Sequence, residues 1–240
     1  MLFVSILGEP SHHKVENFQV LCTSGLEKDW FFDWHGQSIR EFGFELNCID
    51  LCRGETLPPS EEIHSVIVGG SAHLINEKRS WLYDLTQWLK EYRKLHRPFL
   101  GICGGHQLVS TRIFNGNFAK RNTGTIAGTY GIELTDKGRK NPLFKGLPDY
   151  PRFHFANFLH VIPSAEMADS VLARHTESQA IAIDHGDNWY SVQFHPEATR
   201  QMLLCYCRED EDFDPAAYSE THDGPQLFRN FLDIAASSYG

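Results

Sequence analysis

Short apolar runs alternate with amphipathic stretches through the first half of the chain. The runs at 2–7, 44–50, 65–68 and 99–102 are almost continuously hydrophobic, as in strands that a parallel sheet buries on both faces. Between the third and fourth runs, apolar residues recur at helical spacing from about Ser80, namely Trp81, Leu82, Leu85, Trp88, Leu89, Tyr92 and Leu95. This alternation predicts an α/β fold.

The other elements follow from weaker patterns. A helix is expected from about Val15, and the aromatic cluster at 30–34, just ahead of a helix, would either join the core or line a substrate pocket. Irregular strands are expected at 126–134 and 153–161. The runs at 171–175, 180–184 and 189–194 suggest a late β meander.

Composition limits the fold and the class of partner. The 240 residues are 41% hydrophobic and contain no evident linker, so we expect one domain over residues 1–240. The architecture should be a three-layer sandwich with a mostly parallel central sheet, its site lying at the carboxyl edge of the strands. A formal charge of -9 argues against nucleic-acid binding.

The cellular location is predicted from what the apolar and cysteine patterns lack. The opening apolar stretch is too short for a signal peptide, and no stretch reaches membrane-spanning length. The six cysteines show no scaffold spacing, so reduced thiols are expected. These features predict a cytoplasmic protein that does not bind membranes.

A cysteine stands where the run at 99–102 breaks and helical periodicity begins. Cys103 lies between Gly101 and the pair Gly104-Gly105, and residues without a Cβ allow a strained turn that a substrate can approach closely. The N-terminal amides of the next helix would favour the nucleophilic thiolate. A structural core cysteine needs no such glycine spacing, and the phosphate-loop ending Gly-Lys-Ser/Thr is absent. The pattern therefore favours a nucleophile.

Two further motifs could complete this chemistry. Gly69-Gly70 follows the third predicted strand, where glycine amides could face a developing oxyanion or simply form a turn. His195 and Glu197 lie two residues apart, so an extended backbone projects both side chains to one side. An imidazole oriented by a carboxylate can relay the thiol proton. Taken alone, a His-Pro-Glu segment is more often a surface loop.

No metal or cofactor site is predicted. His12 and His13 are adjacent but have no acidic or cysteine partner at ligand spacing. Cys205, Cys207 and the distant His222 form an incomplete ligand set. These three residues belong to a segment at about 199–223 that also holds the acidic run 209–212, which we interpret as a solvated loop, a lid or a docking surface for a basic partner.

The motifs together closely resemble those of the class I glutamine amidotransferases. Gly101-Ile-Cys-Gly-Gly-His-Gln107 fits the family's elbow pattern, and Val192-Gln-Phe-His-Pro-Glu197 fits its second signature. The stretches Gly131–Thr135 and Gly224–Leu232 are similar to its post-elbow strand and closing helix. The resemblance extends over most of the chain and is strongest to free-standing GMP-synthase-like glutaminase domains, which implies a flavodoxin-like fold.

The resemblance also implies the chemistry. Cys103 would attack the glutamine side-chain amide, His195 would act as base and acid, and Glu197 would orient it. Gly70 and Gly104 would supply oxyanion donors, Gln107 would help hold the substrate, and no cofactor would be needed. Ammonia would leave from a γ-glutamyl thioester and pass to a separate synthetase subunit, because these 240 residues contain no nucleotide-binding module.

Departures from the family pattern keep two other functions open. Ser71 replaces a common proline, Gly104 replaces a larger apolar residue, and the segment from 199 to 223 is longer than in relatives. Phe153-His-Phe-Ala-Asn157 stands in place of a Ser-His-x-Asp segment that helps enclose substrate, so another γ-glutamyl compound could replace L-glutamine. The first alternative is a free-standing hydrolase of γ-glutamyl peptides or conjugates. The second, disfavoured by the intact motif set, is a catalytically silent regulatory or binding protein.

Overall fold

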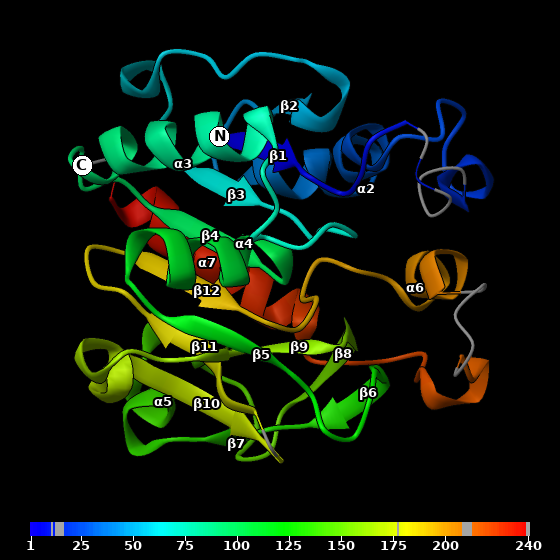
Figure 1. Ribbon diagram of the computed structural model, residues 1–240, viewed down its shortest axis with the longest axis vertical. Coiled ribbons are helices and arrows are strands. Elements are labelled where there is room, and N and C mark those ends of the chain that lie inside the picture. Colours follow the sequence, from blue (N-terminus) through cyan, green and yellow to red (C-terminus); the bar gives the residue numbers. More distant parts are fainter. Residues whose placement is uncertain (11, 13–16, 177, 208–212, 239–240) are drawn as a thin grey trace.

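An eight-stranded mixed sheet forms the centre of the computed structural model (Figure 1). The structure describes residues 1–10, 12, 17–176, 178–207 and 213–238. The strand order is β2-β1-β3-β4-β12-β11-β10-β7. Five neighbouring strands are parallel: β2 (Asn47–Asp50), β1 (Leu2–Ser5), β3 (Val66–Val68), β4 (Phe99–Ile102) and β12 (Trp189–Val192). Antiparallel pairing then adds β11 (Ser178–Asp184), β10 (Val171–His175) and β7 (Glu133–Leu134).

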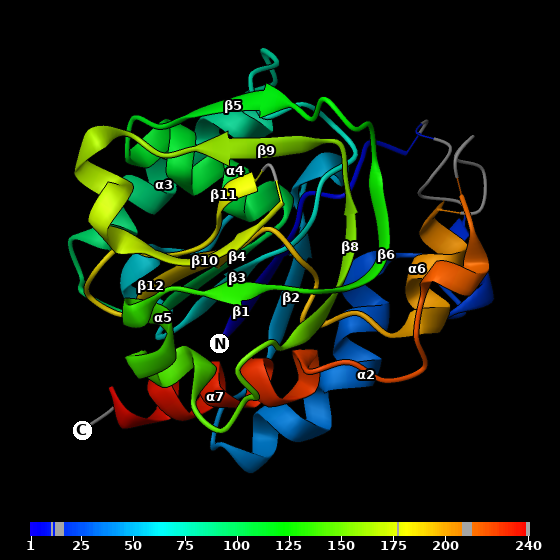
Figure 2. The same ribbon diagram turned by 90° about the horizontal axis from the view of Figure 1, so that it is seen from below.

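Helices cover both faces of the sheet and make it the middle of three layers. Figure 2 shows α2 (Glu27–Glu41) and α7 (Gly224–Ser237) on one face, with α3 (Ser80–Arg93) and α4 (Gly104–Leu108) on the other. The alternation of side chains along β1 supplies both cores. Leu2 and Val4 pack toward α3, whereas Phe3 stacks on Phe31 of α2 with ring centroids 3.7 Å apart. The predicted three-layer α/β fold is confirmed.

Two small antiparallel pairs lie beside the main sheet. β5 (Asn117–Lys120) pairs with β9 (Leu159–Ile162), and β6 (Ile126–Gly131) pairs with β8 (Arg152–Asn157). A π-helical turn at Val109–Ile113 continues α4, α5 spans Asp136–Lys140, and α6 spans Arg200–Cys207. In Figure 1, α6 lies on the side of the molecule toward which β6 and β8 extend.

Several predicted elements differ from those observed. The run at 126–134 divides into β6 and β7 in different sheets, and the run at 153–161 divides into β8 and β9. The strand expected at 44–50 begins only at Asn47. The helix expected from Val15 begins outside the described residues. The next described turn is a 3-10 helix, Asn17–Val20, and the first long helix begins at Glu27.

The aromatic cluster at 30–34 lies inside α2, not ahead of a helix. Trp30 and Phe31 share its buried face with Ile39, because positions separated by about two turns point the same way. Trp34 lies on the outer face with 59% of its surface exposed. The cluster is thus divided between core and surface.

Neither a membrane-spanning helix nor a metal cluster is found in the described part of the chain. Each helix there is too short or too polar to cross a bilayer. No group of three or more His, Cys, Asp or Glu side chains among the described residues could hold a metal ion. Of the residues considered as ligands, Cys207 places its sulfur 3.6 Å from the Tyr218 hydroxyl, and His222 packs against His154. The acidic run 209–212 and His13 lie outside the described residues.

Candidate active site

Cys103 occupies a strained turn between β4 and α4. Its backbone has φ 49° and ψ -99°, a conformation that non-glycine residues rarely adopt and that is held only where the surroundings enforce it. The Cys103 amide donates to the Val192 carbonyl at 2.8 Å, which extends the pairing of β4 with β12. The side chain therefore lies at the carboxyl edge of the sheet, as expected for an elbow.

Parallel pairing of β4 with β12 brings the second motif to the same edge. His195 Nδ1 donates to Glu197 Oε1 at 2.8 Å, and both side chains are almost fully buried. The His195 amide donates to the His154 carbonyl at 2.8 Å, so β8 also fixes this segment. Because the carboxylate accepts at Nδ1, the Nε2 atom is left to act on another group.

Charge around His195 determines its protonation. Burial by itself lowers the pKa of the imidazole, but the Glu197 carboxylate and the neighbouring Cys103 sulfur outweigh it and raise that pKa well above the usual value. Nε2 is buried and has no partner within hydrogen-bonding limits among the described residues. The site therefore favours an imidazolium beside a thiolate.

Gly70 and Gly104 meet directly beside the sulfur. A Cβ at Gly70 would stand 3.1 Å from His195 Cε1 and 3.9 Å from Cys103 Cβ. A Cβ at Gly104 would approach the Ser71 amide nitrogen to 2.7 Å, closer than real Cβ contacts allow. The loop after β3 can thus approach the start of α4 only because both positions lack side chains.

Gln107 lies one helical turn beyond Cys103. Its amide nitrogen donates to the Cys103 carbonyl at 3.0 Å, and its side-chain Nε2 donates to Gln193 Oε1 at 3.2 Å. Both glutamine side chains are buried. The Gln107 side chain is therefore held beside the segment that leads from β12 to His195.

The family profile described as glutamine amidotransferase class-I matches residues 36–202. The chain belongs to this family. The matched range includes both the elbow and the His-Pro-Glu segment, whose side chains the fold brings to one edge of the sheet.

Relatives of this class I glutamine amidotransferase include proteins with different names. Gamma-glutamyl peptidase 3 of Arabidopsis thaliana is 23% identical over 78% of this chain and 78% of its own length. A subunit of the glutamine-hydrolyzing GMP synthase of Sulfolobus acidocaldarius is 24% identical over 79% of this chain and 86% of its own length. A crystal structure of a glutamine amidotransferase from Thermotoga maritima has a TM-score of 0.74 at 18% identity and covers 98% of each chain.

Sequence patterns did not reveal two buried side chains near the site of this amidotransferase. Glu27 begins α2, where its Oε2 hydrogen-bonds the Ser5 hydroxyl at 2.5 Å and its Oε1 lies 3.4 Å from where a Gly69 Cβ would stand. His35 donates from Nε2 to the Glu197 carbonyl at 2.9 Å. Burial lowers the pKa of His35 to about 4, so its ring is neutral. No local pattern marks either residue, since each lies in a helix with ordinary polar spacing.

Glu27 gives the folded state a dependence on pH. Burial raises its pKa from 4.5 to about 8, and the charges of Glu197 and Asp50 add to that rise, while Ser5 and His195 oppose it. Between these pH values the folded state holds a proton that the unfolded chain has lost. Stability should therefore fall as pH rises through this window, by up to about 1.4 kcal/mol per pH unit.

Replacing Glu27 with glutamine should remove this dependence. Urea unfolding at pH 5.5 and pH 7.5 should show a smaller loss of unfolding free energy for Glu27→Gln than for the unchanged protein. Glu91→Gln, at an exposed position on α3, serves as the control and should follow the unchanged protein. Equal pH slopes for all three proteins would show that Glu27 is ionised in the folded state throughout this range.

Proposed function

We propose that this chain is a glutaminase subunit that releases ammonia from the glutamine side-chain amide through a γ-glutamyl thioester on Cys103. The observation that carries the proposal is the ordered set Glu197, His195 and Cys103 at the carboxyl edge of the sheet. Its support is the 2.8 Å contact between Nδ1 and the carboxylate and the raised pKa of His195 in the presence of the sulfur. Family membership supports the same activity.

Acylation would use the histidine twice. His195 Nε2 accepts the thiol proton, and the thiolate attacks the amide carbon. Negative charge moves to the carbonyl oxygen, where the Gly70 and Gly104 amides would donate. The imidazolium then protonates the amide nitrogen, the carbon–nitrogen bond breaks, and ammonia leaves with the thioester formed. Glu197 holds the ring and stabilises its charged form, and Gln107 would help hold the substrate.

Deacylation would reverse these roles with water. His195 takes a proton from water, and the resulting hydroxide attacks the thioester carbon. The sulfur–carbon bond breaks, the thiolate is reprotonated by the imidazolium, and glutamate leaves. All atoms are supplied by glutamine and one water, so the proposed reaction requires no cofactor.

A separate synthetase subunit is the proposed acceptor of the ammonia. Two of the relatives of this chain are named as subunits of a glutamine-hydrolyzing GMP synthase, which implies a partner in those proteins. The proposed setting is the cytoplasm, where free glutamine and such a partner would be met.

The second candidate function is hydrolysis of γ-glutamyl peptides or conjugates. The relative named gamma-glutamyl peptidase 3 favours it, and the thioester chemistry would be unchanged. The two functions differ in what leaves: ammonia in one, an amine-bearing peptide or conjugate in the other.

Substrate profiling decides between them. We expect the purified protein to release ammonia from L-glutamine with a higher kcat/KM than it releases the amine from a γ-glutamyl dipeptide. The reverse ranking would favour the peptidase. An electrophilic glutamine analogue should label the protein at Cys103, and a folded protein that neither labels nor turns over either substrate, with candidate synthetases added, would be catalytically silent.

A further inference from the structure

The segment 218–223 is fastened along β8, the strand that contacts His195. The Tyr218 hydroxyl donates to the Phe155 carbonyl at 2.7 Å, and the Ser219 amide donates to Thr129 Oγ1 at 2.8 Å. At the other end, the amides of Asp223 and Arg152 donate to the Arg152 carbonyl and the Asp223 carboxylate at 2.8 and 2.7 Å. We call this segment the strap. It is the end of the extended stretch that the sequence marked as unusual.

His222 of the strap packs directly on β8. Its ring stacks on His154 with centroids 3.8 Å apart and planes 21° apart. Burial lowers the pKa of His222 to about 4, and burial together with the neighbouring charge of His222 lowers that of His154 to about 3, so both rings are neutral and stack without charge repulsion. His154 is in turn held by Thr129 Oγ1 at its Nδ1, 2.8 Å away.

The same histidine also holds the segment that carries Glu197. His222 Nδ1 accepts from the Gly224 amide at 3.3 Å, and the ring hydrogen-bonds the Ala198 backbone. A Cβ at Gly224 would come within 2.6 Å of the Pro196 carbonyl oxygen, so the strap leads into α7 in close contact with this segment. His222 therefore touches two stretches at once: β8, whose His154 carbonyl accepts from the His195 amide, and the residues on either side of Glu197.

We infer that His222 is a positioning residue, which clamps β8 to the 196–198 segment and so fixes His195 and Glu197 relative to each other and to Cys103. The inference rests on the function proposed above. His222 touches no reacting atom, and its effect passes through the backbone of both motif residues. Because a misplacement of about 1 Å can lower a rate about 10²-fold, small movements here should affect turnover more than substrate binding.

Three variants separate this role from simple packing. His222→Ala removes the stack and both hydrogen bonds, His222→Phe keeps an aromatic ring without the hydrogen bonds, and His222→Gln keeps polar groups without the ring. We expect kcat for the preferred substrate to fall about 10-fold to 10²-fold in the alanine and phenylalanine variants, with KM within about twofold, and partial rescue by glutamine. Tyr218→Phe is the matched control, because it loosens the same strap from β8 without removing the contacts of His222 with His154 and Ala198. It should lower thermal stability and leave kcat near the unchanged value.

A second measurement does not depend on the substrate. Iodoacetamide alkylation of Cys103 should lose rate at a lower pH limit set by the pair with His195, and that profile should shift in His222→Phe because a displaced Glu197 supports the imidazolium less. If the unchanged protein turns over no γ-glutamyl compound, the proposed function fails while this profile still tests the clamp. Any His222 variant that fails to unfold cooperatively is set aside for the other two. Unchanged kcat and an unchanged alkylation profile in the folded variants would overturn the inference.

Discussion

Cys103→Ala should abolish ammonia release from glutamine, with a fall of at least about 10⁴-fold in kcat. The thiol is the group proposed to form the covalent intermediate, and alanine leaves His195 with no nucleophile to activate. Because Cys103 is buried beside other small side chains at the elbow, loss of its sulfur should leave the fold intact. Ammonia measured with a coupled glutamate dehydrogenase reaction reports the loss, and thermal unfolding reports the fold.

Cys48→Ala is the matched control for this variant. Cys48 lies half-buried in β2, and burial raises the pKa of its thiol to about 12, so it is protonated and unreactive at neutral pH. The control should keep full activity and should still be labelled by an electrophilic glutamine analogue. Substantial glutaminase activity in folded Cys103→Ala would contradict the thioester mechanism.

His195→Gln should lower kcat/KM by about 10²-fold to 10⁴-fold, the range typical of a general acid–base group. Glutamine preserves a polar side chain of similar length, but it can neither accept the thiol proton nor return one to the leaving nitrogen. The charge that holds the thiolate is also lost. Alkylation of Cys103 at pH 6 to 7 should therefore slow in the same variant, although its cysteine is unchanged.

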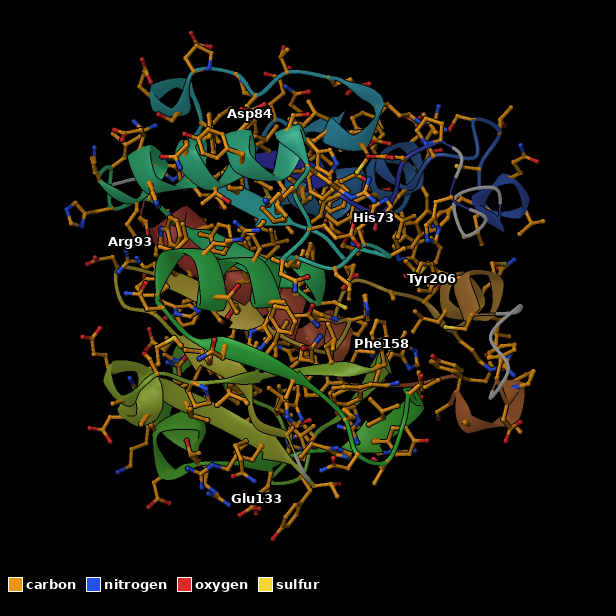
Figure 3. The ribbon with its side chains drawn as sticks, viewed as in Figure 1. His73, Asp84, Arg93, Glu133, Phe158 and Tyr206 are labelled. Atoms are coloured by element: carbon orange, nitrogen blue, oxygen red, sulfur yellow. The ribbon has the colours of Figure 1, made fainter. Side chains whose placement is uncertain are left out.

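His96→Asn provides the comparison for the histidine substitution. His96 follows α3 with 71% of its side chain exposed, and Figure 3 places the neighbouring Arg93 on the side of the molecule opposite to His73, Phe158 and Tyr206. Asparagine tolerates the positive φ of 52° at this position. Rates in this variant should not change. A His195→Gln protein with near-normal turnover would show that another group moves the proton.

The parallel half of the sheet was predictable because its strands are buried on both faces. Residues 65–68 and 99–102 are continuous apolar runs, and the structure makes them β3 and β4 with small changes in their bounds. Predictions were weaker after α4. The stretch 126–134 has the pattern of one strand, yet Gly131 ends β6 and Glu133 pairs with β10 in another sheet. Pairing partners that lie far away along the chain decided those boundaries.

Local sequence alone determined that Cys103 stands on an elbow and that His195 and Glu197 can face the same side, because glycine spacing and a two-residue interval act through the backbone nearby. The tertiary structure decided that these groups meet, since only the parallel pairing of β4 with β12 brings the carboxyl ends of these two distant strands together. It also decided that Glu27, His35 and His222 surround them. Their burial and their contacts with Ser5, Glu197 and His154 depend on packing between distant segments, which leaves no periodic mark on the chain.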